Sequence, residues 1–341
     1  MEPPKLKGYE YDSNIVGNYI QAGRILILYL AYNSQCNLSC PFCFSNGGKH
    51  FVRKSMKQTR NVKELRFDDL IEIIDQGIEL GIKSVCFYGE GEPLLKSDLG
   101  LFFKLVDYVN KKNLIPVVFT NGVTMTPTIA KKLYNKNVSV VGKLYSFKPK
   151  VNEFLTGCHG IYEYKLFKGK RVPSHIPNLM NVGYNKGNRF ALFTVVTKYN
   201  YEEIENIWKW ERSTGIIPYV DFLYTYRHQR RFGISESDRQ RLCKSIYDYD
   251  KSLGFDYEYH LGSHIGHRIC NTRIAAVIGV NGEVRLCPAV DVYIGNVRKN
   301  QLADLLIKRA NLAEKIRFKG DDKGKCGAYR LEERRSQVSQ K

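Results

Sequence analysis

Three cysteines lie close together near the start of the chain, in the run Cys36-Asn-Leu-Ser-Cys40-Pro-Phe-Cys43. Because these thiols fall within eight residues, one loop could bind three corners of a cubane iron–sulfur cluster. Three ligands for four irons would leave one iron open to a small molecule, as catalytic metal sites keep an open position. A zinc site would need a fourth Cys or His nearby, and residues 35–48 contain no other.

This C-x3-C-x2-C spacing, with an aromatic residue before the third cysteine, resembles the radical S-adenosylmethionine (SAM) superfamily. The resemblance implies that the open iron of a 4Fe-4S cluster binds the amino and carboxylate groups of SAM. It also implies that an electron from the cluster cleaves SAM to a 5'-deoxyadenosyl radical, which abstracts a substrate hydrogen. By the same resemblance the ring of Phe42 packs near the adenine.

Two later segments resemble the parts of that family that contact SAM. Gly89-Glu90-Gly91-Glu92-Pro93 is similar to a segment that accepts hydrogen bonds from the methionine ammonium, with Glu90 in place of the first expected glycine. Thr120-Asn121-Gly122 is similar to a segment that lines the same pocket. A plain turn would explain either segment, so their order along the chain is the main evidence for these contacts.

Three single residues complete the implied cofactor contacts. Lys143 and Ser146 follow the fourth expected strand, where relatives often carry Ser and Asp near the ribose, and Lys143 departs from that pattern. Asn200, after the strand that ends near Lys198, is another implied contact. Cys158 and Cys243 have no partner spacing and are either inert or hydrogen donors.

A second group of cysteines resembles the auxiliary-cluster module called twitch, or its longer relative SPASM. Cys270 and Cys287 flank an expected hairpin, and Cys326 follows a helix. This implies a second 4Fe-4S cluster, which accepts electrons or anchors substrate. The fourth ligand stays open between a free iron, Tyr329, Cys243 and a substrate atom, and the alternative is that Cys270 and Cys287 are buried apolar residues.

Strands alternate with helices through the first two thirds of the chain, which predicts an α/β fold with a parallel sheet. Active sites of such sheets lie at the carboxyl ends of the strands, where the cysteine loop falls. With the resemblance, we expect a partial (β/α)6 TIM-like barrel and a small C-terminal α+β iron–sulfur domain. The expected strands are 24–30, 84–88, 115–120, 138–141, 190–197 and 217–223, and the expected helices are 67–80, 99–111, 127–134 and 201–214.

The expected division is an N-terminal leader (1–23), a core barrel (24–232), a linking helix (233–262), a twitch/SPASM-like domain (263–332) and a flexible tail (333–341). The core contains a basic, Gly- and Pro-rich excursion over residues 149–188. In the C-terminal part we expect helices over 237–253 and 301–318. Asn281-Gly282 predicts a hairpin between strands 275–280 and 283–286.

The composition of the chain restricts the classes of protein to which it can belong. Hydrophobic residues make up 43% of 341, and no apolar run approaches the roughly 20 residues that cross a bilayer, so we expect no membrane insertion. The N-terminus lacks a secretion signal, which predicts a cytoplasmic protein. Nine cysteines, an odd number, favour metal binding over disulfides in a reducing compartment.

The net charge of +19 favours anionic partners. We expect a small anionic substrate, such as a nucleotide or a phosphorylated or sugar metabolite, and by the resemblance a reducing partner such as flavodoxin or ferredoxin. Two alternatives remain: a peptide-modifying maturase of the same family, and a basic nucleic-acid-binding iron–sulfur protein. The substrate, the reaction outcome and the oligomeric state stay open.

Overall fold

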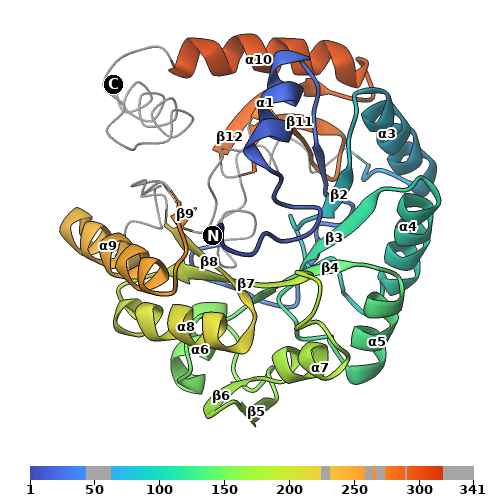
Figure 1. Cartoon of the computed structure of the whole chain (residues 1–341). Coiled ribbons are helices and arrows are strands. Elements are labelled where there is room, and N and C mark those ends of the chain that lie inside the picture. The colour runs from blue at the N-terminus through green and yellow to red at the C-terminus, as the bar shows by residue number, and fades with distance from the viewer. Residues whose placement is uncertain (44–62, 224–230, 258–263, 266–272, 289, 318–341) are drawn as a thin grey trace.

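The computed structural model describes the chain apart from residues 44–62, 224–230, 258–263, 266–272, 289 and 318–341 (Figure 1). Its strands are β1 (Ile27–Leu30), β2 (Ser84–Phe87), β3 (Ile115–Phe119), β4 (Ser139–Lys143), β5 (Tyr164–Phe167), β6 (Lys170–Pro173), β7 (Phe190–Val196), β8 (Ile217–Phe222), β9 (His264–Ile265), β10 (Ala275–Ile278), β11 (Glu283–Cys287) and β12 (Val290–Asn296). Its helices are α1 (Ser13–Gln21), α3 (Phe67–Glu79), α4 (Leu99–Lys111), α5 (Pro127–Asn135), α6 (Pro149–Thr156), α7 (His175–Asn181), α8 (Tyr201–Thr214), α9 (Glu236–Ser252) and α10 (Leu302–Arg317).

One large sheet has the strand order β12-β11-β10-β1-β2-β3-β4-β7-β8-β9. Every neighbouring pair from β10 to β8 is parallel, whereas β11, β12 and β9 join the sheet in antiparallel fashion. The sheet curves into a ring with helices outside it (Figure 1). This mostly parallel arrangement confirms the predicted α/β class, and each strand and helix expected between residues 24 and 223 is present with small shifts at its ends.

The helices that follow β-strands pack on the sheet through apolar residues at helical spacing. In α3, Leu70, Ile73 and Ile74 are buried in one core with Phe87 of β2. The helix stops because Gly81 adopts a left-handed backbone, with φ at 94°, which glycine tolerates without strain. None of the helices in the described part of the chain is long and apolar enough to cross a membrane.

The two faces of the sheet bury different partners. Leu28 and Leu30 of β1 belong to the core shared with the surrounding helices, so their side is the outer face. Tyr29 of β1 and Val141 of β4 belong to a second core that contains residues from the start of the chain. This second side is the inner face, which the ring encloses (Figure 1).

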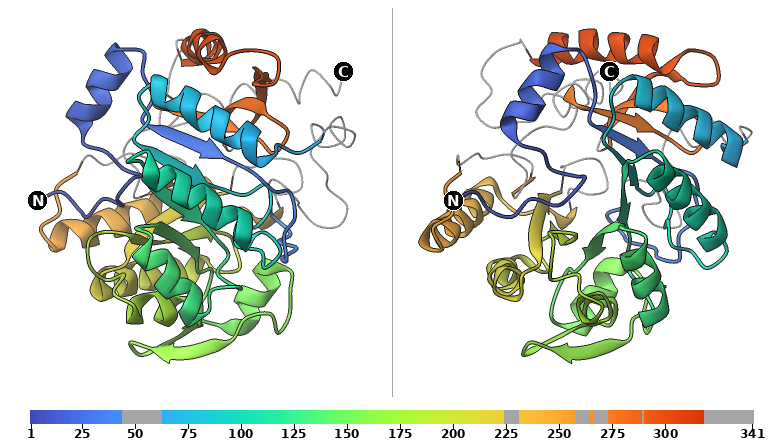
Figure 2. Two further views of the ribbon diagram at one scale, coloured as in Figure 1. Left: turned by 90° about the vertical axis from the view of Figure 1, so that its right-hand side faces the viewer. Right: turned by 45° about the vertical axis from the view of Figure 1, so that its right-hand side comes forward.

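The first 21 residues fill the inner face where the strands begin, and are here called the N-terminal segment. Leu6 and Tyr9 are buried against the sheet, and Tyr9 contacts the rings of Tyr29 and Tyr219 at centroid distances of 6.3 and 5.7 Å. Tyr11 donates a hydrogen bond to Ser84 at the start of β2. The expected leader is therefore part of the core, and α1 lies beside the same end of the ring (Figure 2).

The basic excursion between β4 and β7 contains more structure than its composition indicated. It forms α6, the antiparallel pair β5–β6 and α7. From α7, Asn178 donates a hydrogen bond of 2.8 Å to the carbonyl of Met125. The excursion therefore supports the loop after β3 from outside.

The C-terminal hairpin forms as expected at Asn281-Gly282, but the described residues of 263–332 do not build a sheet of their own. Instead β10 pairs in parallel with β1, with Ala275 opposite Ile27, and β11 and β12 continue the same sheet. Helix α10 packs on β11 and β12. A hairpin signal is local, so it does not reveal which sheet the hairpin will join.

Candidate functional site

The three clustered cysteines lie in the loop that follows β1, at the carboxyl end of the strand. Cys36 is exposed, and Cys40 and Cys43 are half-buried. The amide of Cys43 donates to the carbonyl of Cys40 at 3.0 Å, which turns the loop. The amide of Ser39 bonds the carbonyl of Thr156 at the end of α6, so the excursion also holds this loop.

Two N–H donors point at the sulfur of Cys36. They are the backbone amide of Leu38, at 3.4 Å, and the side-chain amide of Asn121, at 4.0 Å. Such donors stabilise a thiolate and tune a cluster that it binds. The Asn121 side chain also donates to Asn37 at 2.8 Å, so the loop after β3 is tied to the cysteine loop.

Burial and neighbouring thiols raise the pKa of Cys36 and of Cys40, although the described residues alone do not form a complete metal site. Burial raises the pKa of Cys40 well above its usual value, and the neighbouring Cys43 and Cys36 raise it further. Burial of the Cys36 thiol raises its pKa to about 11, although the donors Leu38 and Asn121 lower it. Within the described residues, no group of three or more His, Cys, Asp or Glu is already placed to hold a metal ion. The donor set fits an iron–sulfur cluster, which would draw the thiols together and deprotonate them.

Glu92 organises the loops beside the cysteines. Its carboxylate is buried and accepts hydrogen bonds from the Thr120 hydroxyl at 2.5 Å, the Asn121 amide at 2.7 Å and the Leu94 amide at 2.9 Å. Burial raises the pKa of Glu92, while these donors lower it. Its own amide bonds the carbonyl of Gln35, so Glu92 joins the loops after β1, β2 and β3.

Two glycines allow this close approach. A Cβ on Gly91 would lie 2.1 Å from the carbonyl oxygen of Gln35, and a Cβ on Gly89 would lie 1.7 Å from the carbonyl oxygen of Gly91. Both distances are impossible for a real side chain. Gly89 and Gly91 are therefore needed for the packing of the β2 loop, whatever else they contact.

Glu90, in the same loop, faces a different partner. Its carboxylate forms a buried ion pair with Arg285 of β11, which also pairs with Glu283. The amide of Val280 donates to Glu90 at 3.4 Å. Glu90 thus ties the β2 loop to the C-terminal hairpin, away from the cysteine loop.

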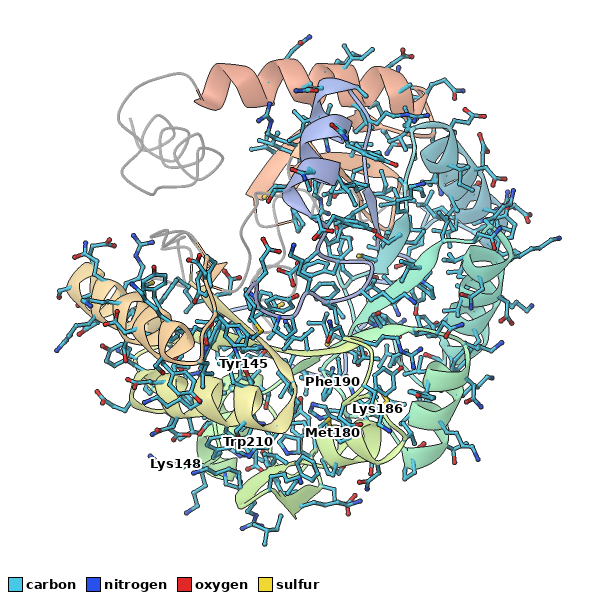
Figure 3. The ribbon with its side chains drawn as sticks, viewed as in Figure 1. Tyr145, Lys148, Met180, Lys186, Phe190 and Trp210 are labelled. Carbon is cyan, nitrogen blue, oxygen red and sulfur yellow. The ribbon has the colours of Figure 1, made fainter. Side chains whose placement is uncertain are left out.

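Phe42 lies in a small apolar cluster above the strand ends. Its ring contacts Tyr145 at 5.5 Å and Phe232 at 6.3 Å, both edge to face, and Cys40 packs on the same cluster. In Figure 3, Tyr145 lies nearer the centre of the ring than Trp210 and Lys148. An aromatic surface next to the thiols suits a stacked base.

The remaining predicted cofactor contacts differ in how many contacts their side chains already make within the protein. Lys143 ends β4 and lies over the ring of Phe193, with its Nζ 4.1 Å from the ring centroid. Ser146 donates to Glu203 at 2.7 Å. Asn200 makes four hydrogen bonds, accepting from the amide and hydroxyl of Thr197 and donating to two carbonyls. A cofactor contact by Asn200 would require one of these bonds to break.

Of the proposed auxiliary ligands, the structure describes only Cys287, because Cys270 and Cys326 lie outside the described residues. Cys287 is buried at the end of β11. It follows Arg285 by two residues, and Arg285 is paired with Val277 of the inner-face core. Side chains alternate along a strand, so Cys287 also belongs to the inner face.

Two residues contact the site loops although neither was among the predicted cluster ligands or SAM contacts. The hydroxyl of Tyr162 donates to the carbonyl of Asn121 at 3.0 Å, and the thiol of Cys158 donates to the carbonyl of Asn37 at 3.6 Å. Both come from the basic excursion, whose path could not be predicted. Their contacts add to the evidence that this excursion supports the cysteine loop and the β3 loop.

A model of a known protein family matches this chain. The model described as "Radical SAM superfamily" matches residues 32–210, which run from the loop after β1 to most of α8. The matched part contains Cys36, Cys40 and Cys43 and the loops after the first four strands.

Several curated proteins are similar to this chain. An AdoMet-dependent heme synthase of Methanosarcina barkeri is 24% identical to this chain. The alignment covers 86% of this chain and 84% of that protein. The mycofactocin maturase MftC of Mycolicibacterium smegmatis is 26% identical over 74% of this chain and 62% of its own length. A GTP 3',8-cyclase of Aliarcobacter butzleri is 35% identical over 31% of this chain and 30% of its own.

A solved structure, native anSMEcpe with bound AdoMet, shares the fold. It is 17% identical to this chain, with a TM-score of 0.58, and the alignment covers 86% of this chain and 84% of the other. At this identity the likeness shows the fold alone.

Proposed function

This chain belongs to the radical SAM superfamily of enzymes, and we propose that Cys36, Cys40 and Cys43 hold its 4Fe-4S cluster and leave one iron to bind SAM. The observation that carries this proposal is the loop after β1, which contains the three thiols within eight residues and places two N–H donors toward the Cys36 sulfur. When bound, the cluster and SAM supply a 5'-deoxyadenosyl radical that abstracts a substrate hydrogen.

The protein's own groups would bind and orient SAM. Glu92 fixes Thr120 and Asn121 beside the cysteine loop, and these loops would hold the methionine half. Phe42 would offer its ring to the adenine. Holding the reactants in one geometry is the main contribution that a protein makes to cofactor chemistry.

We propose that the substrate is a small anionic molecule. The net charge of +19 raises the local concentration of anions, and two similar proteins are named for GTP and heme chemistry. A peptide-modifying maturase is the second candidate, because a similar protein is named as a maturase and aligns with 74% of this chain.

We also propose a second 4Fe-4S cluster bound by Cys270, Cys287 and Cys326, within a twitch/SPASM-like C-terminal module. The burial of Cys287 on the inner face supports this site, because the ring encloses that face. This cluster would accept an electron from the substrate or anchor it. An external reductant such as flavodoxin or ferredoxin would supply electrons to the first cluster.

The proposal is tested by SAM cleavage after anaerobic reconstitution and reduction with dithionite. The wild-type protein should form 5'-deoxyadenosine, and the variant Cys36→Ala/Cys40→Ala/Cys43→Ala should not. Cys86→Ala is the matched control, because Cys86 is fully buried in β2 and belongs to neither proposed cluster. Wild-type rates in the triple variant would contradict the proposal.

The same triple variant tests the second cluster through its iron and sulfide content. About four irons per chain should remain if Cys270, Cys287 and Cys326 bind a cubane cluster. A content near zero would remove this cluster from the proposal, together with its redox and anchoring roles.

A further inference from the structure

The antiparallel pair β5–β6 and the start of α6 form a surface rich in positive charge, within the basic excursion. Residues 148–171 contain six lysines and arginines against two glutamates. We call the six cations the basic patch: Lys148, Lys150, Lys165, Lys168, Lys170 and Arg171. Leu166 lies among them with 80% of its surface exposed, and β5–β6 lies at the outer rim of the ring (Figure 1).

The turn between β5 and β6 presents a lysine at its tip. Phe167 pairs with Lys170, so the turn consists of Lys168 and Gly169, whose φ angles are 47° and 75°. Two left-handed residues make a type I′ turn, in which Asn or Gly is preferred at the first position. An exposed lysine in this conformation indicates that the position is occupied for its side chain and not for its backbone.

Much of this positive charge is not neutralised within the patch. Lys148 pairs with Glu203 at 3.1 Å, and Lys165 pairs with Glu163 at 3.6 Å. Within the described residues, the other lysines of the patch form no ion pair. A surface of one sign attracts proteins of the opposite sign and speeds their association.

A chain of contacts connects the basic patch to the cysteine loop. The hydroxyl of Tyr164, in β5, accepts a hydrogen bond of 3.1 Å from the side-chain amide of Asn152, in α6. The side-chain oxygen of Asn152 accepts another, also of 3.1 Å, from the backbone amide of Tyr145. The ring of Tyr145 contacts Phe42 at 5.5 Å, and Cys40 packs on the same apolar cluster.

Helix α6 makes a second connection between the same two places. It begins beside the patch at Pro149 and ends at Thr156, whose carbonyl accepts from the amide of Ser39 in the cysteine loop. A Cβ on Gly157 would lie 2.2 Å from the carbonyl oxygen of Ser39, so glycine allows this close approach. Eight helical residues span about 12 Å. Because electron tunnelling slows steeply with distance, a surface one short helix away from the thiols suits an electron donor.

We propose that the basic patch docks a small acidic electron-transfer protein, here called the carrier, which reduces the cluster held by the cysteine loop. One electron passes from the reduced carrier to the oxidised cluster, and no bond forms or breaks in this step. Leu166 would supply an apolar contact within the charged surface. Transient redox complexes have small interfaces, so a patch of this size is sufficient. The inference rests on the proposed function, since it names the surface used by the reductant of the same cluster.

Two other uses of the basic patch have to be separated from this one. Lysines on the exposed edges of β5–β6 would prevent strand pairing with other molecules, which predicts no effect of their charge on electron transfer. A nucleic-acid surface predicts salt-dependent binding of oligonucleotides. Carrier docking predicts a change in electron transfer from the carrier alone.

The experiment compares two triple variants of the full chain after anaerobic reconstitution. The patch variant is Lys150→Glu/Lys168→Glu/Lys170→Glu, and the control variant is Lys83→Glu/Lys104→Glu/Lys131→Glu. All six lysines are exposed, and both variants change the net charge equally. Formation of 5'-deoxyadenosine is measured with dithionite, and then with increasing concentrations of reduced flavodoxin and of reduced ferredoxin, of which the more effective is used.

With dithionite, we expect both variants to form 5'-deoxyadenosine within about twofold of the wild-type rate, because a small reductant does not need the patch. With the carrier, the KM for the carrier should rise about tenfold or more in the patch variant, with little change in the maximal rate. The control variant should stay within about twofold. Added salt should raise the KM of the wild type towards that of the patch variant.

The inference is overturned if the patch variant keeps the wild-type KM, or if the control variant loses as much. It is also overturned if the wild type cleaves SAM with dithionite but accepts electrons from neither carrier. Loss of cleavage with dithionite in the patch variant alone would assign the patch to support of the cysteine loop.

A nucleic-acid role would appear as oligonucleotide binding that the patch variant loses while its KM for the carrier stays unchanged, and this result would also overturn the inference. Failure of the proposed function looks different, because the wild type itself would then fail to cleave SAM with dithionite.

Discussion

The two ends of the strands in this ring are built in different ways. At the amino ends, the N-terminal segment packs Leu6 and Tyr9 into the inner-face core, and Tyr219 donates a hydrogen bond to Glu10. At the carboxyl ends lie the thiols of the cysteine loop and the ammonium of Lys143. The amino end thus contributes stability, and the carboxyl end keeps groups available for chemistry, as in other parallel β/α folds.

The ion pair of Glu90 and Arg285 is an exception to this division. It lies toward the carboxyl ends of the strands, yet it is fully buried and contributes to stability. Changing Arg285 to Met would leave Glu90 and Glu283 as buried carboxylates without their cation. We expect the free energy of unfolding to fall by about 4 kcal/mol, measured by denaturant unfolding. The exposed pair of Arg241 and Asp238 is the control, and Arg241→Met should leave the free energy of unfolding nearly unchanged, because exposed ion pairs contribute little.

An equal, small effect of both substitutions would show that the Glu90–Arg285 pair contributes little. The link between the β2 loop and the hairpin would then have to depend on backbone pairing.

The division itself is tested at the amino end by Leu6→Ala. Leu6 is fully buried, so we expect a loss of about 3 kcal/mol of stability, measured by the same unfolding assay. SAM cleavage per folded molecule should not change, because Leu6 packs at the amino ends of the strands, opposite the cysteine loop. The exposed Leu253 offers a control. A selective loss of SAM cleavage in Leu6→Ala would argue against the division.

Glu10, which lies at the amino ends of the strands, should make the stability of the fold depend on pH. Burial raises the pKa of Glu10 to about 7, although the hydrogen bond from Tyr219 lowers it. A raised pKa means that the fold favours the neutral acid, so this contribution is complete below about pH 4.5 and is lost as the pH rises through 7. We expect a decrease of about 2 kcal/mol over that range.

Unfolding curves at several pH values check this expectation, with Glu10→Gln as the comparison. The glutamine stays neutral and should lack the decrease that the wild type shows between pH 4.5 and 7. Parallel curves for the two proteins would show that Glu10 is not the group responsible.

Glu92→Gln should weaken SAM binding at the carboxyl ends of the strands, with little effect on the fold. A glutamine presents one oxygen where the carboxylate uses both to hold Thr120, Asn121 and Leu94. We expect about tenfold weaker SAM binding, equal to about 1.4 kcal/mol, measured by equilibrium dialysis. Glu79→Gln, at an exposed position of α3, should bind as the wild type does, and equal affinities for both variants would remove Glu92 from the SAM site.

Much of the core could be predicted because its signals are local. The spacing of Cys36, Cys40 and Cys43 lies within one loop, and helical periodicity in α3 or alternating burial in β7 is visible in short windows. The same holds for the Asn281-Gly282 turn. These signals gave the order of elements, and parallel pairing then placed the loops at one end of the ring.

Contacts between distant segments could not be predicted in this way. Glu90 and Glu92 are two residues apart in one motif, yet one pairs with Arg285 and the other with the β3 loop. Asn200 looks like a polar residue available for a ligand, but its hydrogen bonds are already made. The packing of Leu6 likewise depends on the inner face that only the folded, curved sheet creates, so the N-terminal segment looked like a leader.

The central claim is that one iron of the Cys36–Cys40–Cys43 cluster is open and binds SAM. The most direct test is electron paramagnetic resonance of the dithionite-reduced variant Cys270→Ala/Cys287→Ala/Cys326→Ala, which would retain only the first cluster, with and without SAM. The account predicts a reduced cluster signal whose g-values change when SAM is added. A signal that SAM does not alter, or no cluster signal in this variant, would contradict the account.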